Sequence, residues 1–277
     1  MHVSTLLVDA LLDEDVPHGD LTTHLLGIGE RAARMRFFLR RDGVACGTEL
    51  ALALVRRAGA EGRVLAPSGA RLAAGAPLLE AEGPAGPILA AWKVAQTTVE
   101  YLSGIAGATA AIVDAARAVA PGIAVVTTRK TFPGTKRLMI AAIRAGGANP
   151  HRLGLSETLL VFPEHRVFLA DPVAALAALR RAAPEKKVVV EITSRAEAER
   201  LLAATPDILQ CEKMPPDAVA DLVAALRARG GGPLVAVAGG VVAANAAAYA
   251  ATGADILVTS APYSAAPADV KVEIGPA

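Results

Sequence analysis

The sequence predicts an α/β protein in two parts, a small N-terminal α+β unit and a larger domain built on a parallel sheet. In the first part, turns that carry Gly or Pro separate short strand-like runs. After Gly122, six short apolar segments alternate with amphipathic helical stretches, which is typical of a parallel sheet covered by helices. Hydrophobic residues make up 53% of the 277 positions, enough for a substantial buried core. The second part is therefore predicted to be either barrel-like or doubly wound.

The N-terminal part contains three candidate strands and one long candidate helix. The strands are residues 34–40, 62–66 and 77–81. A helical stretch follows from about residue 87 to 120, and we expect Ser103, Gly104 and Gly107 to bend or interrupt it.

The second part supplies the parallel strands and their helices. The candidate strands are residues 123–127, 158–162, 187–192, 207–211, 233–238 and 255–259, and the main candidate helices are residues 172–183, 195–204, 215–229 and 243–252. Six strands do not establish a complete eight-stranded barrel.

Composition and charge argue against several classes of protein. Lys and Arg total 28 and Asp and Glu total 27, so the net charge of +1 gives no strong field for nucleic acid. Aromatic residues make up 3% of the chain, which leaves little for base stacking. Cys46 and Cys211 lie far apart and form no disulfide framework, which favours a reducing cytosol. The partners expected are small molecules.

The sequence also favours a cytoplasmic location. Asp9, Asp13 and Glu14 come before any long apolar run, so we expect no signal peptide. We expect charges or prolines to interrupt every apolar stretch before it reaches the length of a membrane span.

One segment, residues 115–156, contains no Asp or Glu. It carries seven permanent cations, which are Arg117, Arg129, Lys130, Lys136, Arg137, Arg144 and Arg152, together with His151. Arg129 and Lys130 directly follow a candidate strand, and His151 and Arg152 stand just before the next one.

The carboxyl ends of parallel strands form the ligand face of such domains. The planar fork of Arg holds a carboxylate or phosphate through two parallel hydrogen bonds. We therefore expect Arg129 and Arg152 to contact a polyanionic small molecule. Lys136, Arg137 and Arg144 fit a solvated helix face equally well.

A candidate phosphate site follows the strand at 233–238. Gly239 and Gly240 let the backbone approach a ligand, and a helix N-terminus follows with free N–H groups. The next strand ends at Thr259 and Ser260, whose hydroxyl groups can contact the same phosphate.

Two acidic residues also stand at strand ends, Glu191 and Glu212. A carboxylate there can bind Mg²⁺ through water, accept a ribose hydroxyl group or stabilise developing positive charge. The alternative for each is a salt bridge to a neighbouring arginine.

These residues fall within motifs that resemble those of one enzyme family. Residues 128–134 (TRKTFPG), 145–147 (AGG) and 151–155 (HRLGL) resemble the central signature of quinolinate phosphoribosyltransferases, also called nicotinate-nucleotide pyrophosphorylases (carboxylating). Residues 19–23 (GDLTT), 102–106 (LSGIA) and 239–255 resemble further motifs of that family in the same order. The resemblance covers nearly the whole chain.

The resemblance implies a fold and an assembly. It implies an N-terminal α/β sandwich over residues 1–106, joined by the tail 265–277, and an incomplete, TIM-like α/β barrel over residues 107–264. It also implies a homodimer in which the N-terminal part of one subunit closes the barrel site of the other, and it leaves higher oligomers open.

The resemblance further implies a reaction. Members of the family transfer ribose 5-phosphate from 5-phosphoribosyl 1-pyrophosphate, with Mg²⁺, to a pyridine dicarboxylate, and release pyrophosphate and CO₂. By motif position, Arg129, His151 and Arg152 would face the acceptor's carboxylates. Lys130, Glu191 and Glu212 would face the donor and its metal. The 5-phosphate would be held by Gly239, Gly240, Thr259 and Ser260.

The chain departs from the family pattern on the acceptor side. A family lysine is replaced by Phe162, and an arginine on the helix between the domains is replaced by Lys93. Phe162 removes a cation, and Lys93 cannot make the paired hydrogen bonds that an arginine makes. In this asymmetry the chain is similar to the ModD-type pyrophosphorylases, a branch associated with molybdate-transport genes, for which a role in molybdenum use is implied. The acceptor, and whether decarboxylation is retained, stay open.

Two alternative functions remain at the level of the sequence. One is a barrel that binds phosphate or an oxyanion and has lost catalysis. The other is a phosphosugar aldolase or isomerase, for which Lys213 is the one candidate Schiff-base residue.

Overall fold

The computed structural model describes residues 3–277 and divides into two compact units. Unit 1 comprises Met1–Ala110, Phe132–Gly147 and Pro262–Ala277, and unit 2 comprises Ala111–Thr131 and Ala148–Ala261. Phe132–Gly147 belongs to unit 1, although we expected it in the barrel domain. The reason is close packing, since a Cβ atom on Gly146 would lie 2.5 Å from the carbonyl oxygen of Ala106.

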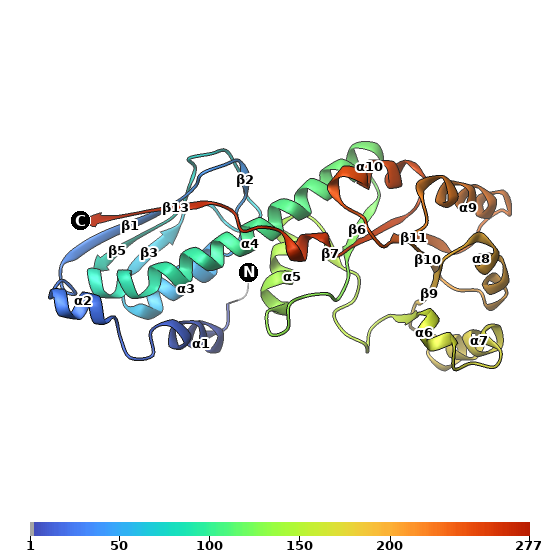
Figure 1. Ribbon diagram of the computed structural model, residues 1–277, viewed down its shortest axis with the longest axis horizontal. Coiled ribbons are helices and arrows are strands. Elements are labelled where there is room, and N and C mark those ends of the chain that lie inside the picture. Colours follow the sequence, from blue (N-terminus) through green and yellow to red (C-terminus); the bar gives the residue numbers. More distant parts are fainter. Residues whose placement is uncertain (1–2) are drawn as a thin grey trace. The chain divides into compact units, whose positions relative to one another are not determined.

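Unit 1 is built on an antiparallel sheet of four strands in the order β13-β1-β5-β3. The strands are β1 (Ala32–Leu39), β3 (Glu61–Val64), β5 (Pro77–Pro84) and β13 (Val270–Pro276). Figure 1 shows β13, from the end of the chain, beside β1, and the register pairs Phe37 with Val272. Alternate residues of β1 are buried, among them Met35 and Phe37, so one face of the sheet contributes to the core. A short pair of strands, β2 (Gly43–Val44) and β4 (Arg71–Leu72), accompanies this sheet.

Helices complete this unit. They are α1 (Thr5–Asp15), α2 (Leu21–Leu26), α3 (Thr48–Ala58), the first part of α4 (Ala85–Val119) and α5 (Lys136–Ala145). Leu50 and Leu54 of α3 pack into the same core as Met35 and Phe37 of β1. An α/β unit with helices packed on its sheet is therefore observed.

Helix α4 runs unbroken over 35 residues, so an interruption at Ser103, Gly104 or Gly107, one of the two expected effects, is not observed. Within residues 3–277, α4 is also the one helix that is long and apolar enough to cross a membrane, with a mean hydropathy of 1.3 in its most apolar window. Lys93, Glu100 and Asp114 fall within this helix, so charged residues interrupt its apolar run, as expected. Ile88, Ala91 and Val99 of α4 are buried in the core of unit 1, so its apolar character is that of a core helix.

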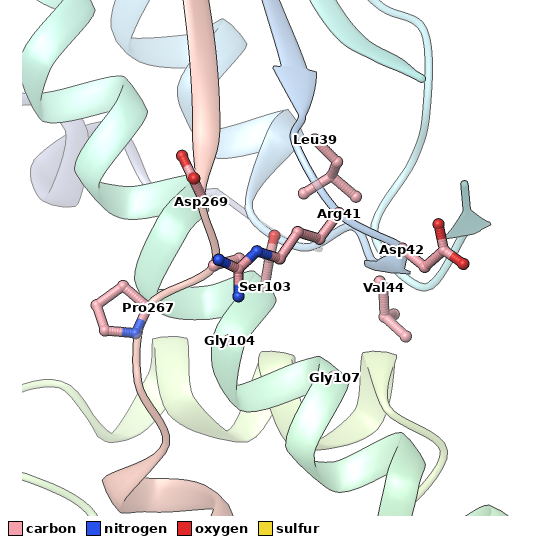
Figure 2. Close-up of a pocket in the computed structure, with 11 residues that line it drawn as sticks. Leu39, Arg41, Asp42, Val44, Ser103, Gly104, Gly107, Pro267 and Asp269 are labelled. Carbon is pink, nitrogen blue, oxygen red and sulfur yellow. The ribbon is translucent and has the colours of Figure 1, made fainter. Parts of the chain in front are cut away.

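Gly104 allows the C-terminal tail to pass directly over α4. A Cβ atom on Gly104 would lie 2.2 Å from the carbonyl oxygen of Ala266. The next part of the tail is held by a hydrogen bond of 2.8 Å from the backbone N–H of Ala268 to the carbonyl of Glu100. Figure 2 shows Gly104 and Pro267 at this crossing, within a pocket of about 380 Å³. Glycine is therefore needed here for close approach and not as a helix breaker.

Unit 2 contains a parallel sheet of seven strands in the order β7-β6-β12-β11-β10-β9-β8. The strands are β6 (Ala124–Thr127), β7 (Asn149–Pro150), β8 (Leu159–Val161), β9 (Val188–Ile192), β10 (Ile208–Glu212), β11 (Leu234–Ala238) and β12 (Ile256–Thr259). All six strands expected from the sequence are confirmed. The seventh, β7, has two residues, too few for a periodic pattern.

The helices of unit 2 follow the strands as expected. They are α6 (Pro163–Arg166), α7 (Pro172–Ala182), α8 (Arg195–Leu201), α9 (Pro216–Ala228) and α10 (Ala243–Ala251), with 3₁₀ turns at Leu202–Ala204 and Ala261–Ser264. The sheet has two edges, β7 and β8, so the barrel is incomplete. A small apolar cluster that includes Val189, Ala236 and Val258 packs together from β9, β11 and β12. Because every strand runs in the same direction, all seven carboxyl ends meet at one edge, where α/β barrels place their sites.

We expect Gly104→Ala to lower the free energy of unfolding by about 1–3 kcal/mol, because the new methyl group would collide with the backbone of the tail. The control is Gly107→Ala in the same helix, where an added Cβ atom meets nothing within 4 Å. That change should stabilise the protein by about 0.5–1 kcal/mol, because alanine is the better helix former. Urea unfolding of both variants tests the prediction, and equal stability for the two would contradict it.

Candidate active site

A cavity of about 600 Å³ lies at the carboxyl ends of the strands of unit 2. The turns after β6, β7, β8, β10, β11 and β12, and the end of β9, all contribute residues to it. Nearly every site residue expected in the barrel lines this one cavity. They are Arg129, Lys130, His151, Arg152, Phe162, Glu191, Glu212, Gly239, Gly240 and Ser260.

The basic wall of the cavity comes from the turns after β6 and β7. Arg129 and Lys130 follow β6, and His151 and Arg152 follow β7, which pairs with β6. The side chain of Arg152 is buried, and its Nη1 atom donates to the carbonyl of Thr158 at 3.4 Å. Burial, and then the charge of Arg129, lower the pKa of Arg152, which as an arginine still stays charged. Two guanidinium groups in one cavity favour an anionic ligand, because the ligand relieves their repulsion.

His151 is the neutral member of this wall. Burial and then the charge of Arg152 lower the pKa of His151 below its ordinary value of 6.5. Near neutral pH the ring is therefore mostly uncharged, and it offers a hydrogen bond more than a charge.

The acidic wall comes from β9 and β10. Glu191 and Gln210 are partners in the parallel register, and Gln210 Nε2 donates to Glu191 Oε2 at 2.9 Å. Glu212 lies two residues beyond Gln210, on the same face of the strand. Burial raises the pKa of Glu191, and the charges of Glu212 and Glu164 add to this, while the hydrogen bond from Gln210 opposes it. The carboxylate is thus positioned by a neutral donor in a cavity that holds other carboxylates.

Gln210 has one unsatisfied polar atom. Its side chain is 4% exposed, and its Oε1 atom has no hydrogen-bond partner within residues 3–277. A buried carbonyl oxygen without a donor costs about 1–3 kcal/mol. Because this atom is itself out of reach of solvent, the cost accompanies the placement of Gln210 beside Glu191.

Arg166 of α6 is a positioning residue that sequence reasoning missed. Its buried guanidinium donates to the backbone carbonyl of Glu191 and to the carboxylate of Glu197. It contacts the carbonyl of Glu191 and not the carboxylate, so the expected alternative of a salt bridge to Glu191 is not observed. In the sequence Arg166 ends a short polar run that reads as a surface helix, and nothing there signals its burial.

Phe162 forms an aromatic wall beside the basic one. It precedes α6, and its ring stacks on His165 with centroids 5.7 Å apart. The backbone N–H of Phe162 donates to His165 Nδ1 at 3.0 Å, and the guanidinium carbon of Arg152 lies 5.8 Å from the ring centroid. Arg152 therefore reaches from the turn after β7 to the strand at the opposite edge of the sheet. Glu164, two residues after Phe162, lines the same cavity.

The glycine turn after β11 forms a third wall. Gly239 and Gly240 have φ angles of 85° and 84°, which favour glycine. A Cβ atom on Gly239 would also lie 2.8 Å from Glu212 Oε1, so no side chain fits there. Asn245 holds the turn from α10, where its Oδ1 accepts from the N–H of Val242 at 2.8 Å and its Nδ2 donates to Gly240 at 2.9 Å. Ser260 lines the cavity next to this turn.

Thr259 is a correction to the expected phosphate site. It is 2% exposed, and its hydroxyl group donates to the carbonyl of Val241 at 2.7 Å. The hydroxyl also accepts from the N–H of Ala261 at 3.1 Å. Because the strand's alternation turns this side chain inward, Thr259 shapes the turn and does not face the cavity.

Four other cations considered from the sequence belong to unit 1, and a fifth, Lys213, lines the cavity. Lys93 lies on α4 in unit 1, where its Nζ atom sits 4.3 Å from the ring centroid of Trp92 and donates to Gln96 at 3.2 Å. Lys136, Arg137 and Arg144 lie on α5, also in unit 1. Lys213 does line the cavity, but its side chain is 78% exposed and its Nζ atom is 3.9 Å from Glu212 Oε1. It is therefore not the desolvated lysine that Schiff-base chemistry needs.

Comparison with known proteins gives a consistent result. Residues 105–273 match the family model of the quinolinate phosphoribosyl transferase C-terminal domain, and residues 20–103 match that of its N-terminal domain. The chain is 46% identical over 240 residues to a protein of Rhodobacter capsulatus with the provisional name pyrophosphorylase ModD, covering 86% of this chain and 92% of that protein. It is 36% identical over 251 residues to a nicotinate-nucleotide pyrophosphorylase (carboxylating) of Mycobacterium leprae, covering 89% and 88%.

The fold has the same relatives. The structure of NadC from Streptococcus pyogenes matches with a TM-score of 0.90 and 25% identity, covering 100% of this chain and 99% of that one. The nicotinate-nucleotide pyrophosphorylase of Francisella tularensis matches in fold with a TM-score of 0.88. The two family models together span most of the chain, and the chain belongs to the quinolinate phosphoribosyl transferase family.

Proposed function

We propose that this protein transfers a phosphoribosyl group from 5-phosphoribosyl 1-pyrophosphate to quinolinate or a related anionic heteroaromatic ring, with release of pyrophosphate. The observation that carries the proposal is one cavity with a basic, an acidic and a glycine wall. Such a cavity suits two anionic substrates that react through a cationic sugar. The names of the relatives support the same reaction.

The donor fits the glycine and acidic walls. The turn at Gly239 and Gly240, with Ser260, presents backbone and hydroxyl groups suited to the 5-phosphate. The ribose hydroxyl groups would lie over Glu191, whose carboxylate is held by the hydrogen bond from Gln210.

The chemistry follows from the charges beside the donor. When the bond from C1 of the ribose to pyrophosphate breaks, the sugar gains positive charge and the leaving group gains negative charge. Glu191 or Glu212 would stabilise the sugar, and Lys130 would stabilise the pyrophosphate. No covalent intermediate with the protein is needed.

The acceptor fits the basic wall. Arg129 and Arg152 would hold its carboxylate through paired hydrogen bonds, and His151 would add a neutral one. Their task is to keep the ring nitrogen in line with C1, because orientation is the main contribution that a bound nucleophile needs.

The proposed cofactor is Mg²⁺, and the donor set fits it in one way. Within residues 3–277 no group of three or more His, Cys, Asp or Glu side chains could hold a metal by itself. Glu191 and Glu212 share the cavity, however, and Mg²⁺ is commonly held by one or two carboxylates together with substrate phosphates. Bound in that way, the ion would neutralise charge on the pyrophosphate.

The proposal extends to the setting of the protein. We propose a cytoplasmic enzyme that works as a homodimer with a shared site, to which Lys93 of a second subunit would contribute. We also propose a role in molybdenum use, which the resemblance to the ModD branch implies.

Calorimetry with 5-phosphoribosyl 1-pyrophosphate, followed by a pyrophosphate-release assay over a panel of heteroaromatic acids, tests the proposal. Binding of the donor and acceptor-dependent release support it. Donor or phosphate binding without release over the whole panel would indicate a binding protein that has lost catalysis. Absence of donor binding would reject the proposal.

Arg129→Ala should weaken acceptor binding about 100-fold, equivalent to about 2.7 kcal/mol, because a charged two-pronged contact is lost. Binding of the donor should change little. The control is Arg137→Ala, which removes a cation of the same segment that lies on α5, in unit 1. Equal acceptor affinity in the two variants, measured by calorimetry with the donor present, would remove Arg129 from the acceptor site.

Glu191→Ala should lower kcat by about 10²–10³-fold with a smaller effect on KM, because a carboxylate near the developing charge acts mainly in the transition state. Arg166 contacts the backbone of residue 191, so this contact can survive the change. Glu185→Ala, on the exposed surface, is the control. An unchanged kcat for Glu191→Ala would exclude this carboxylate from the mechanism.

A further inference from the structure

Glu164 is a carboxylate of the cavity that the reaction above does not use. It lies on α6 and lines the cavity together with Phe162 and Arg152. Neither a hydrogen bond nor an ion pair to its carboxylate occurs within residues 3–277. Its negative charge is one of the smaller causes that raise the pKa of Glu191, so the two carboxylates of this cavity act on each other.

The wall around Glu164 is fixed before any ligand binds. The ring of Phe162 is held by its stacking on His165 and by the hydrogen bond from its own N–H to His165 Nδ1. Arg152, whose guanidinium carbon lies 5.8 Å from the ring centroid of Phe162, is anchored to the carbonyl of Thr158. A ring whose carboxylate pairs with Arg152 would lie beside Phe162, with another of its edges available to Glu164 in the same cavity.

The chemistry of that edge is the opposite of the chemistry of the basic wall. Arg129 and Arg152 suffice for one carboxylate held through paired hydrogen bonds. A second carboxylate on the same ring would meet an apolar ring and a like charge, and like charges placed together in a binding site oppose binding. A hydrogen-bond donor at that position would instead be accepted by Glu164.

We propose that the acceptor is a flat heteroaromatic ring with one carboxylate, held by Arg129 and Arg152, and with an amino group, accepted by Glu164, in place of a second carboxylate. This proposal narrows the class of acceptor and rests on the proposed phosphoribosyl transfer. In the transfer the ring nitrogen gives its lone pair to C1 of the ribose. The C1–oxygen bond breaks, and pyrophosphate leaves with the bonding electrons. The ring keeps its carboxylate, so no CO₂ is released.

Three pyridines with the same skeleton test the inference on the full-length protein. They are pyridine-2,3-dicarboxylate, pyridine-3-carboxylate and 2-aminopyridine-3-carboxylate. Their affinities are measured by calorimetry with the donor present, and turnover is measured by pyrophosphate release and by the mass of the nucleotide product. We expect the amino compound to exceed the dicarboxylate at least tenfold in kcat/KM or affinity, and its product to retain the carboxylate.

Two variants link the preference to the named residues. Glu164→Gln keeps the size of the side chain and removes its charge, so the advantage of the amino compound over pyridine-3-carboxylate should fall at least fivefold. Phe162→Lys adds a cation to the same wall and should raise kcat/KM for the dicarboxylate at least tenfold. Glu185→Gln, on the exposed surface, should leave all three values unchanged.

The outcomes separate this inference from the function on which it rests. Preference for the dicarboxylate in the unaltered protein would overturn the inference and leave phosphoribosyl transfer standing. Donor binding with no affinity for the amino compound, or an amino advantage that Glu164→Gln leaves intact, would also overturn it. Failure to bind 5-phosphoribosyl 1-pyrophosphate would instead reject the proposed function itself.

Discussion

The parallel hydrogen bonding of the seven strands in unit 2 is the constraint on which the site depends. It brings the carboxyl ends of strands from β6 to β12 to one edge, although their residues lie more than a hundred positions apart in the sequence. It also fixes which side chains meet, as in the register pair of Gln210 and Glu191. A slip of one residue would turn Glu191 to the other face of the sheet. The composition of the cavity therefore depends on the register of the strands as much as on the types of residue.

The open edge of this barrel adds a second constraint. The sheet ends at β7 and β8, which do not pair with each other. Arg152 follows β7 but contacts the carbonyl of Thr158 and approaches the ring of Phe162, both of which flank β8. A buried cation thus links the two edges without backbone pairing. The positive charges of Arg152 and Arg129 repel each other, and a bound anion would relieve this repulsion.

Much of this architecture could be predicted from sequence, because apolar strands and amphipathic helices leave periodic patterns. The six longer strands were predicted in this way, and the basic residues after β6 and β7 were found from the local excess of positive charge. Short strands carry no such pattern, so β7 was missed. Gly104 was expected to bend or interrupt its helix. Its close contact with the C-terminal tail was missed, because the contacting residue lies 162 positions further along the chain. Nothing local in a sequence reports such a contact.

Arg166 and Thr259 show the same limit within the site. Both are polar residues next to predicted site residues, and sequence alone cannot tell whether such a side chain faces a ligand or supports a neighbour. Burial shows that both are supporting residues. Arg166 donates a hydrogen bond to the backbone carbonyl of Glu191, and the hydroxyl group of Thr259 donates to the carbonyl of Val241. The resemblance to a family placed the expected residues at one edge of the barrel, where most of them line one cavity, but the direction of each side chain required the structure.

The contacts of Arg166 have a consequence for how such a site can diverge. This residue closes the short helix that begins just after Phe162 and carries Glu164, and its guanidinium grips the peptide group of Glu191 on the next strand. A mutation that reshapes the helix to admit a new acceptor therefore also affects the position of Glu191, the carboxylate proposed to act on the donor. Mutations in α6 and mutations in β9 should therefore show epistasis. Laboratory evolution of acceptor choice would then advance faster through paired libraries that vary the helix and β9 together than through either segment alone.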